Sequence, residues 1–264
     1  MKDNYVTMTN YPSLPPQAVS LPVAIDYPAA LALRQMALVQ DELPKYLLAP
    51  EVNALLYYVH DLHRKMLLAT LWNTGARVNE ALALTRADFS LTSSLPFVQL
   101  ATLKQRAEKA ARTAGRAPAG SQAHRLVPLS DQHYVSQLQM MIATLKIPME
   151  RRNKRTGRTE KARIWEITDR TVRTWINEAV DAAAAAADGV TFSVPVTPHT
   201  FRHSYAMHML YAGLPLKVLQ SLMGHKSVSS TEVYTKVFAL DVAARHRVQF
   251  SMAEADAVAM LKTR

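Results

Sequence analysis

Apolar side chains recur every three or four residues along most of the chain, which is the spacing of helices with one buried face. The first such run follows Pro50, a residue that suits a first helical position, and its apolar members are Val52, Leu55, Leu56 and Val59. A second helix is predicted from Asp61 to Trp72, with Gly75 as its C-cap. Thr74 is expected to cap a further short helix that has Arg77 in its first turn.

The pattern changes to strand-forming residues in two places. Residues 96–104, "PFVQLATLK", are rich in strand formers, and residues 124–130, "HRLVPLS", have the character of a returning partner. They bracket a basic loop that is long for a hairpin connection, which indicates a binding role or disorder. A second basic stretch, residues 151–163, precedes a helix that Asp169 is expected to cap and that continues through an alanine run to Gly189.

The stretch "PHTFRHSYAMH" predicts a helix of about four turns. Thr197 suits its N-cap, Pro198 its first position and Gly213 its end. Its expected buried face repeats at helical spacing and consists of Phe201, Tyr205, Met209 and Ala212. Three polar residues fall mostly to one side of that face, namely His199, Arg202 and His203.

Two more helices are predicted after Gly213. A short one ends at Gly224, and its inward-facing residues are expected to be Val218, Leu219, Leu222 and Met223. "SSTE", residues 229–232, matches a capping box that starts a helix containing Tyr234. With the strand pair, these helices predict a mainly α protein with a small antiparallel β-sheet, an α+β fold.

The two ends of the chain differ from its middle. Six of the 14 prolines fall in the first 44 residues, where only Leu31 to Val39 has a helical pattern. We therefore expect residues 1–47 to form a proline-rich arm with one short helix, and residues 48–250 to form a compact domain. Residues 251–264 include the amphipathic stretch "SMAEADAVAMLK", which predicts a C-terminal helix.

Composition narrows the class of protein. The 264 residues include no cysteine, which excludes disulfides and thiolate metal ligands. No signal peptide or membrane-length apolar run is visible, so we expect a soluble protein of a bacterial-type cytoplasm with no membrane span. The formal net charge of +10 favours a polyanionic partner such as nucleic acid, because each Lys or Arg that neutralises a phosphate releases a counterion. A solvated basic surface and an anionic membrane are the alternatives.

The polar residues of 199–203 leave three interpretations open. His199 and His203 have the i, i+4 spacing of a zinc site, but the glutamate of an HExxH motif is replaced by Thr200. A plainer interpretation is that His199 caps the helix and His203 is a satisfied core or surface histidine. The third is phosphate chemistry, because Arg202 offers a planar fork for two phosphate oxygens and His199 offers a titratable proton donor.

One arrangement spans residues 199–237. An H-x-x-R is followed by a G-H and, nine residues after that histidine, by a tyrosine; its members are His199, Arg202, Gly224, His225 and Tyr234. This arrangement resembles the C-terminal signature of the tyrosine recombinases, the phage-integrase-like family of DNA strand transferases. Upstream, "TGARVNEALALTRADF" is similar to the family's first-arginine box, with Arg77 as the arginine and Glu80 at the acidic position. The resemblance covers about residues 48–240.

The resemblance implies the catalytic-domain fold of that family and a set of site residues. Tyr234 would be the nucleophile of a 3′-phosphotyrosyl intermediate, and Arg77 and Arg202 would clamp the phosphate, a stabilisation of the kind found in oxyanion holes. His225 would add a hydrogen bond to the same oxygens, and His199 would accept the proton of the tyrosine.

The family's catalytic lysine would protonate the departing 5′-hydroxyl. It maps to Lys104 on the predicted hairpin, and Lys109 in the long loop is the alternative, because the spacing between the lysine and the returning strand departs from the family's pattern. No metal and no cofactor are required.

The implied function is site-specific recombination by a homo-tetramer on two double-stranded DNA sites, in plasmid multimer resolution or in DNA integration or inversion, with accessory DNA-bending proteins. Residues 1–47 are too few for the N-terminal helical domain of many members. The loops 104–125 and 151–163, with Arg170 and Arg173, are therefore expected to hold the DNA. Shorter members include plasmid resolvases, which the tail "YTKVFALDVAARHRVQF" resembles.

Other outcomes stay open at this point. Type IB topoisomerase-like activity would use similar residues without needing two sites, and a regulator could keep the fold and bind DNA without cleaving it. The C-terminal stretch, residues 251–264, either docks on a neighbouring subunit, as such tails do in this family, or folds back on its own domain.

Overall fold

A computed structural model describes most of the chain. The described residues are 23, 27–38, 44–101, 124–153, 155–187, 189–225 and 227–246, with six further positions between 252 and 262. Lys104 and Lys109 lie outside the described residues, as does the rest of the loop between the two predicted hairpin strands.

The helices and strands follow one another in an order that interleaves a small sheet with helices. Within the described residues they are α1 (Tyr27–Leu38), α2 (Ala49–Tyr57), α3 (Leu62–Thr74), α4 (Val78–Ala81), the 3₁₀ turn η1 (Arg86–Asp88), β1 (Phe89–Ser90), β2 (Phe97–Ala101), β3 (His124–Pro128), α6 (Gln132–Thr144), β4 (Glu150–Arg152), β5 (Thr159–Lys161), α7 (Asp169–Ala185), α8 (Pro198–Tyr211), α9 (Leu216–Met223) and α10 (Ser229–His246).

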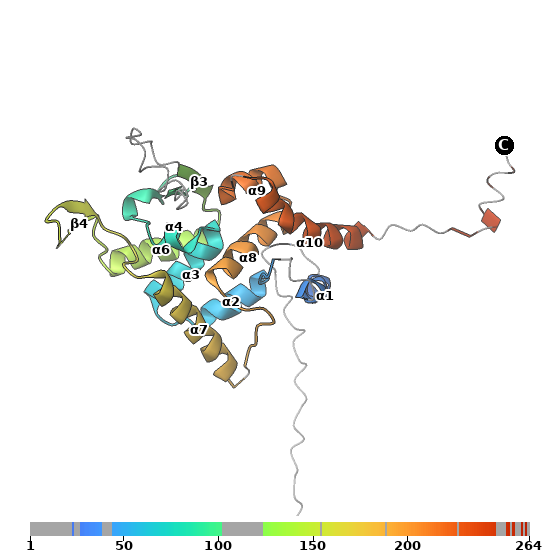
Figure 1. The fold of residues 1–264 in the computed structure, drawn as a ribbon, viewed down its shortest axis with the longest axis horizontal. Helices are drawn as coiled ribbons and strands as arrows, with labels where there is room; N and C mark the ends of the chain where they lie inside the picture. The colour runs from blue at the N-terminus through green and yellow to red at the C-terminus, as the bar shows by residue number, and fades with distance from the viewer. Residues whose placement is uncertain are drawn as a thin grey trace, which may run out of the picture.

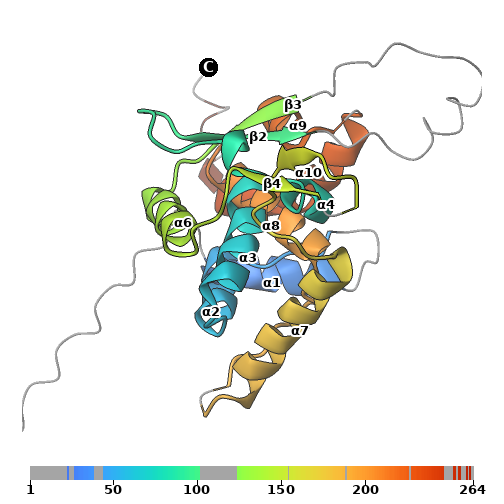
Figure 2. The ribbon, with the colours of Figure 1, turned by 90° about the vertical axis from the view of Figure 1, so that its left-hand side faces the viewer.

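In the part of the chain that the structure describes, two antiparallel sheets accompany the helices, so the predicted fold, mainly α with a small antiparallel β-sheet, is confirmed. One sheet has the order β1-β2-β3 and the other is the β4–β5 hairpin. In the first, Val98 pairs with Val127, and Leu100 pairs with Arg125. The three-stranded sheet lies at one end of the molecule and α7 at the other, with α3 and α8 between them (Figure 2).

The apolar residues form two clusters that meet along α8. The larger one joins α2, α3, β2, β3, α6 and α7, and includes Phe201 from α8. The smaller one joins α1, α8, α9 and α10, and includes Tyr205 and Tyr234. Because α8 contributes to both clusters, most of its side chains are buried, and it runs through the middle of the molecule (Figure 1).

Several predicted helix ends are confirmed. Asp61 caps α3 by accepting a hydrogen bond from the Arg64 backbone N–H, and Gly75 ends that helix in the left-handed conformation. Thr197 caps α8 by accepting from the Thr200 backbone N–H. An N-cap residue accepts a hydrogen bond from a backbone N–H only two or three residues further along the chain. Such caps can therefore be predicted from the local sequence.

Other local predictions are wrong by a residue or by a face. Thr74 is the last residue of α3, and Arg77 is itself the N-cap of α4 rather than a first-turn residue. The cap of α7 is Thr168 rather than Asp169, and this helix ends at Ala185. The α10 helix starts at Ser229, whose backbone N–H donates to the side chain of Ser227. Two residues expected to face inward, Ala212 and Val218, are exposed.

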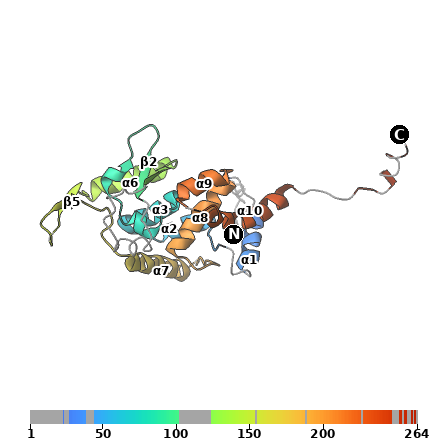
Figure 3. The ribbon, with the colours of Figure 1, turned by 45° about the horizontal axis from the view of Figure 1, so that its top comes forward.

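The described part of the N-terminal segment packs on the rest of the molecule. Helix α1 contacts α10, and the two lie side by side in Figure 3. From α1, the buried Arg34 forms an ion pair with Glu51 and donates to the Ser193 hydroxyl. The boundary between an arm and a compact domain at residue 47 stays a prediction.

Among the described residues, no helix combines the length and the apolar character needed to cross a bilayer.

Candidate active site

Arg202 is the buried centre of the site. Its side chain extends from the first turns of α8 and is 5% exposed. One terminal nitrogen donates to the backbone carbonyl of Gly75 and the other donates to that of Met223, at 2.6 Å. The guanidinium is thus fixed between the ends of α3 and α9, which come from the two apolar clusters.

Gly75 is required at its position for two reasons. Its φ of 59° lies in the left-handed region, which glycine adopts at little cost. A Cβ at this position would lie 2.3 Å from Cδ1 of Tyr205, so no side chain fits between α3 and α8. The glycine therefore ends α3 and brings its carbonyl to Arg202.

A buried carboxylate links the second and third arginines of the site. Glu80 is 1% exposed, and it accepts from Arg77 at 3.0 Å and from two nitrogens of Arg125, at 2.6 and 3.2 Å. It also accepts from the backbone N–H of Arg77, which fixes the start of α4. The side chain of Arg77 is 38% exposed, so the guanidinium that Glu80 holds still faces outward.

Arg125 also explains the glycine of the G-H pair. Its Nε donates to the carbonyl of Leu222, and its guanidinium lies over the end of α9. A Cβ at Gly224 would lie 3.0 Å from Nη1 of Arg125, and the φ of Gly224 is 63°. A side chain at this position would therefore push on the arginine that holds Glu80.

Positive charge is in excess at this site. Burial, followed by the charges of Arg77 and Arg125, lowers the pKa of Arg202 to about 10, although Glu80 opposes this. Burial by itself would raise the pKa of Glu80. The hydrogen bonds and charge of Arg125, and after them the hydrogen bond and charge of Arg77, outweigh burial and hold this pKa below its usual value. Three guanidiniums therefore surround one ionised carboxylate, an arrangement that favours a bound anion.

His225 follows α9 and faces the same arginines. Burial first, and then the charges of Arg202, Arg77 and Arg125, lower the pKa of His225 to about 4, so its imidazole is neutral at neutral pH. Its Nδ1 lies 2.8 Å from the hydroxyl of the buried Thr231. This contact fixes the ring and leaves Nε2 for another partner.

Tyr234 lies in the second turn of α10 and is 2% exposed. Burial raises the pKa of Tyr234 to about 12, while the charges of Arg202 and Arg77 act in the opposite direction. Its hydroxyl lies 2.9 Å from Nδ1 of His203, and the two ring centroids are 5.6 Å apart. The tyrosine therefore shares the field of the arginines and is held by a histidine of α8.

The structure brings together four of the six predicted site residues: Arg77, Arg202, His225 and Tyr234. The fifth, His199, is exposed, and its ring centroid is 6.5 Å from that of His203. The sixth, Lys104, lies outside the described residues.

Two residues of the cluster were missed. His203 follows Arg202 directly, but on sequence it was interpreted only as a zinc ligand or a satisfied histidine. Arg125 lies on β3, 45 residues from Glu80, and "HRLVPLS" indicates only a strand. On sequence, Arg125 fell at the end of the basic loop 104–125, which was expected to hold DNA.

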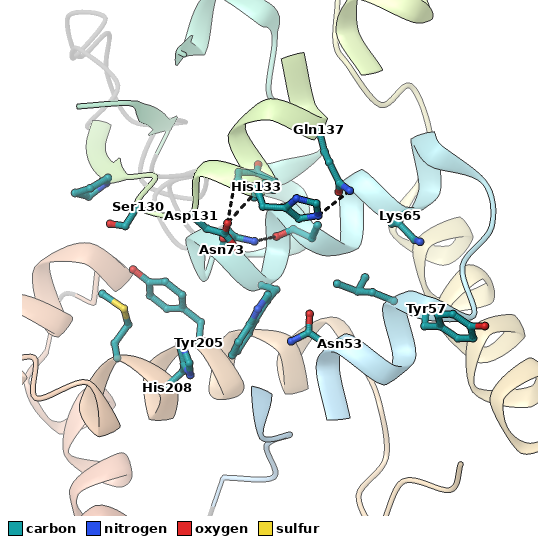
Figure 4. A pocket seen from close by; sticks show the side chains of 16 residues that line it. Asn53, Tyr57, Lys65, Asn73, Ser130, Asp131, His133, Gln137, Tyr205 and His208 are labelled. Atoms are coloured by element: carbon teal, nitrogen blue, oxygen red, sulfur yellow. Dashed lines mark hydrogen bonds between the residues drawn. The ribbon is translucent and has the colours of Figure 1, made fainter. Parts of the chain in front are cut away.

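A cavity of about 620 Å³ lies elsewhere on α8, and none of the predicted site residues lines it. Side chains of α2, α3, α6 and α8 surround it, among them Asn53, Asn73, His133 and His208 (Figure 4). Among the described residues, no group of three or more histidines and carboxylates could hold a metal ion.

Residues 45–240 match the phage integrase family. The chain belongs to this family. The order of the arginine, histidine and tyrosine motifs had predicted the same family from sequence, and the recombinase is accordingly a tyrosine-type site-specific recombination enzyme.

Similar proteins extend this assignment. The recombinase is 87% identical over 247 residues to a protein of Escherichia coli named "Resolvase", with 94% of each chain covered. Solved structures share the fold at lower identity. The XerA recombinase is 19% identical with a TM-score of 0.55, and the match covers 79% of this chain and 67% of that one. The XerH recombinase bound to a palindromic difH substrate, a post-cleavage complex, is 20% identical with a TM-score of 0.53, and the match covers 76% of this chain and 53% of that one.

Proposed function

We propose that the recombinase cleaves and rejoins DNA through a 3′-phosphotyrosyl bond to Tyr234. The observation that carries this proposal is the buried Tyr234 hydroxyl within the field of Arg202 and Arg77, in a cluster where guanidiniums outnumber carboxylates. A tyrosine hydroxyl is a weak nucleophile, so it needs an electrophile that positive charge has already activated. A phosphodiester clamped between these arginines meets that need.

The two arginines would have distinct tasks. Arg202 has five N–H donors, and two of its nitrogens are anchored by backbone carbonyls, so its remaining N–H groups can donate to a phosphate at a fixed place. Arg77 is more exposed and is held at one end by Glu80, which leaves the other end for the second non-bridging oxygen. Donors fixed in advance stabilise the charge of the pentavalent transition state, as in an oxyanion hole.

The histidines and the lysine would complete the chemistry. When the Thr231 hydroxyl donates to Nδ1 of His225, Nε2 carries the proton and can donate to a phosphate oxygen. Lys104 would protonate the leaving 5′-oxygen, with Lys109 as the alternative. His199, which is exposed, would accept the proton of Tyr234.

The partner we propose is double-stranded DNA. The β4–β5 hairpin projects from the body of the molecule (Figure 1), and its exposed basic side chains are Arg152, Arg155, Arg158 and Lys161. Arg151 is already occupied, because it pairs with Glu160 and Glu166. The exposed Arg170 at the start of α7 extends the basic surface, whereas the neighbouring Arg173 pairs with Asp169. The loop 102–123 would add to this surface.

We further propose a homo-tetramer on two DNA sites, assisted by DNA-bending proteins, in a bacterial cytoplasm. The similar protein is named "Resolvase", and of the roles expected from sequence we propose resolution, with plasmid multimers as the substrate. Residues 251–264 would form a tail that docks on a neighbouring subunit and couples assembly to cleavage. Residues 48–250 would be the catalytic domain and residues 1–47 its arm.

A covalent trap tests the proposal. Purified recombinase is mixed with nicked DNA fragments of its own replicon, from which the cleaved piece diffuses away, and the products are run on a denaturing gel. We expect a DNA-linked protein band that Tyr234→Phe abolishes. Tyr211→Phe is the matched control, since it also removes a buried tyrosine hydroxyl, in this case one that meets Tyr46 at 3.2 Å.

Each other outcome points to a different function. A band with relaxation of DNA that carries a single site would indicate topoisomerase-like activity. Firm DNA binding with no band, even after host extract is added, would indicate a regulator that has lost catalysis.

A further inference from the structure

Helix α1 lies outside the region that matches the family and packs on the helix that carries Tyr234. The match covers residues 45–240, whereas α1 spans Tyr27–Leu38. Helix α1 contacts α10, and the two helices lie side by side (Figure 3). Ala30 of α1 is 0% exposed and belongs to the same apolar cluster as Tyr234. The packing around the proposed nucleophile therefore includes an element from outside the matched region.

Arg34, one turn after Ala30, ties the same side of α1 to the rest of the protein. It forms an ion pair with Glu51 in the first turn of α2, and it donates to the hydroxyl of Ser193, at 2.7 Å, in the segment before α8. Arg34 is 1% exposed, and a buried ion pair is costly to break because one charge is left without a partner. Helix α1 is therefore fixed on α2 and on the segment before α8, independently of its contact with α10.

The other helices that pack on α10 carry the arginine side of the site. Arg202 extends from α8, and one of the carbonyls that anchor it belongs to Met223, the last residue of α9. Both helices therefore have to stay in place if the arginines are to hold a phosphate. The contact between α1 and α10 carries no such requirement, so it can be lost while the arginines keep their positions.

We propose that α1 is an autoinhibitory latch, which holds α10 where Tyr234 is buried and lets this tyrosine reach a phosphate only after the two helices separate. The inference rests on the proposed role of Tyr234 as the nucleophile. Tyr234 is 2% exposed, in a cluster to which Ala30 contributes, so a phosphodiester cannot reach its hydroxyl while this packing is intact. DNA in the site favours the open arrangement, because only there do phosphate and hydroxyl meet. The closed arrangement binds DNA without cutting it.

The test compares the same substitution at two positions of α1. Ala30→Lys places a long charged side chain in the apolar cluster, one turn from Arg34, and pushes α10 away from α1. Ala32→Lys adds the same side chain at an exposed position of α1 and is the control. Nitration of the free protein, followed by peptide mass spectrometry, measures the accessibility of Tyr234. Because an open minor state is typically populated at about 0.1–10%, we expect nitration of Tyr234 to rise about tenfold or more in Ala30→Lys, and not in the control.

Cleavage of nicked DNA should change in the same direction. We expect the single-turnover rate of Ala30→Lys to exceed that of the wild type several-fold, because more of the protein has its tyrosine accessible. A substitution that only damages the fold lowers the rate, so a gain identifies release of the latch. A rate at or below the wild-type rate, or nitration of Tyr234 that does not increase, would overturn the proposal. Failure of the proposed chemistry is a different result, in which wild-type protein gives no adduct that depends on Tyr234.

A distance measurement covers the case in which Ala30→Lys fails to fold. The chain has no cysteine, so spin labels can be attached to two introduced ones at exposed positions, Ala32→Cys on α1 and Ala239→Cys on α10. We expect the distance between these labels to lengthen when nicked DNA binds. The distance from Ala32→Cys to Asn53→Cys on α2 should stay constant, because Arg34 holds α1 there. A distance between α1 and α10 that DNA leaves unchanged would overturn the proposal, whether or not cleavage follows.

Discussion

The arginine side and the tyrosine side of the site are held in different ways. Arg202, Glu80 and Arg125 are joined by side-chain hydrogen bonds to one another or to backbone carbonyls at the ends of α3 and α9. Tyr234 is placed by the packing of α10 against α1, α8 and α9, and by its contact with His203. The arginine side is held by several hydrogen bonds between different elements, whereas the position of the tyrosine depends on the packing of one helix, α10.

This difference fits the two tasks in strand cleavage. Groups that stabilise a transition state work best when they are already in place, because no reorganisation is then needed during the reaction. Tyr234, which we propose as the nucleophile, is 2% exposed and would have to become accessible, so we expect α10 to shift when DNA binds. The predictions below separate the two sides by their effects on rate and on stability.

The largest effect is expected from Arg202→Lys. Lysine has no planar fork, so it cannot satisfy the carbonyls of Gly75 and Met223 and also contact a phosphate. We expect the single-turnover cleavage rate to fall about 10²- to 10³-fold, the cost typical of losing one oxyanion-hole donor. Arg34→Lys, at a buried arginine that pairs with Glu51, should leave cleavage by the folded protein near wild type. Equal losses in the two variants would contradict a special role for Arg202.

Arg125→Met should act mainly through stability. It leaves the buried Glu80 with Arg77 alone, and breaking a buried ion pair costs about 3 kcal/mol. Urea unfolding would measure this loss in the free energy of unfolding. The double variant Arg125→Met, Glu80→Gln should recover part of the lost free energy of unfolding, because position 80 then carries no buried charge that needs a second arginine. A double variant less stable than the single one would refute this account of Glu80.

Gly75→Ala should lower the free energy of unfolding more than Gly157→Ala does. Both glycines have a positive φ, 59° and 68°, so both substitutions pay for a left-handed backbone, about 1–2 kcal/mol. Only at Gly75 does the new Cβ meet another residue, Tyr205, whereas nothing lies within 4 Å at Gly157. We expect Gly75→Ala to be destabilised by about 2 kcal/mol more, measured by urea unfolding. Equal costs would mean that the close approach of α3 and α8 is not needed.

The smallest effect is expected on the tyrosine side, from Thr231→Val. This change removes the hydroxyl that lies 2.8 Å from Nδ1 of His225 and keeps the shape of the buried side chain. The free energy of unfolding should drop by about 1 kcal/mol, the net contribution of one hydrogen bond. If the same free energy is lost in positioning His225 at the phosphate, the cleavage rate should fall by roughly fivefold. A rate loss as large as that of Arg202→Lys would remove the distinction between the two sides.

Local signals in the sequence predicted most of the helices and the family. Asp61, Gly75 and Thr197 act within three or four residues of their own positions, so sequence alone placed the ends of α3 and the start of α8. The motif order also placed Arg77 and Tyr234 in one site, although that prediction came from the resemblance and not from the spacing.

The parts that sequence did not predict depend on distant contacts. Arg125 reaches Glu80 only because β3 pairs with β2 near α4 and α9. His203 meets Tyr234 only because α10 crosses α8, 31 residues further along the chain. Val218 belongs to the apolar pattern of α9 but is exposed. The prediction failed because periodicity shows which residues share a face of a helix and does not show what packs against that face.

The most direct test of the account identifies the atom that joins protein to DNA. After trapping on a nicked substrate, the complex would be digested with protease and nuclease, and the remaining adduct would be located by mass spectrometry. The account predicts a nucleotide 3′-phosphate on the hydroxyl of Tyr234. An adduct on any other residue, or a 5′-phosphate linkage, would contradict it.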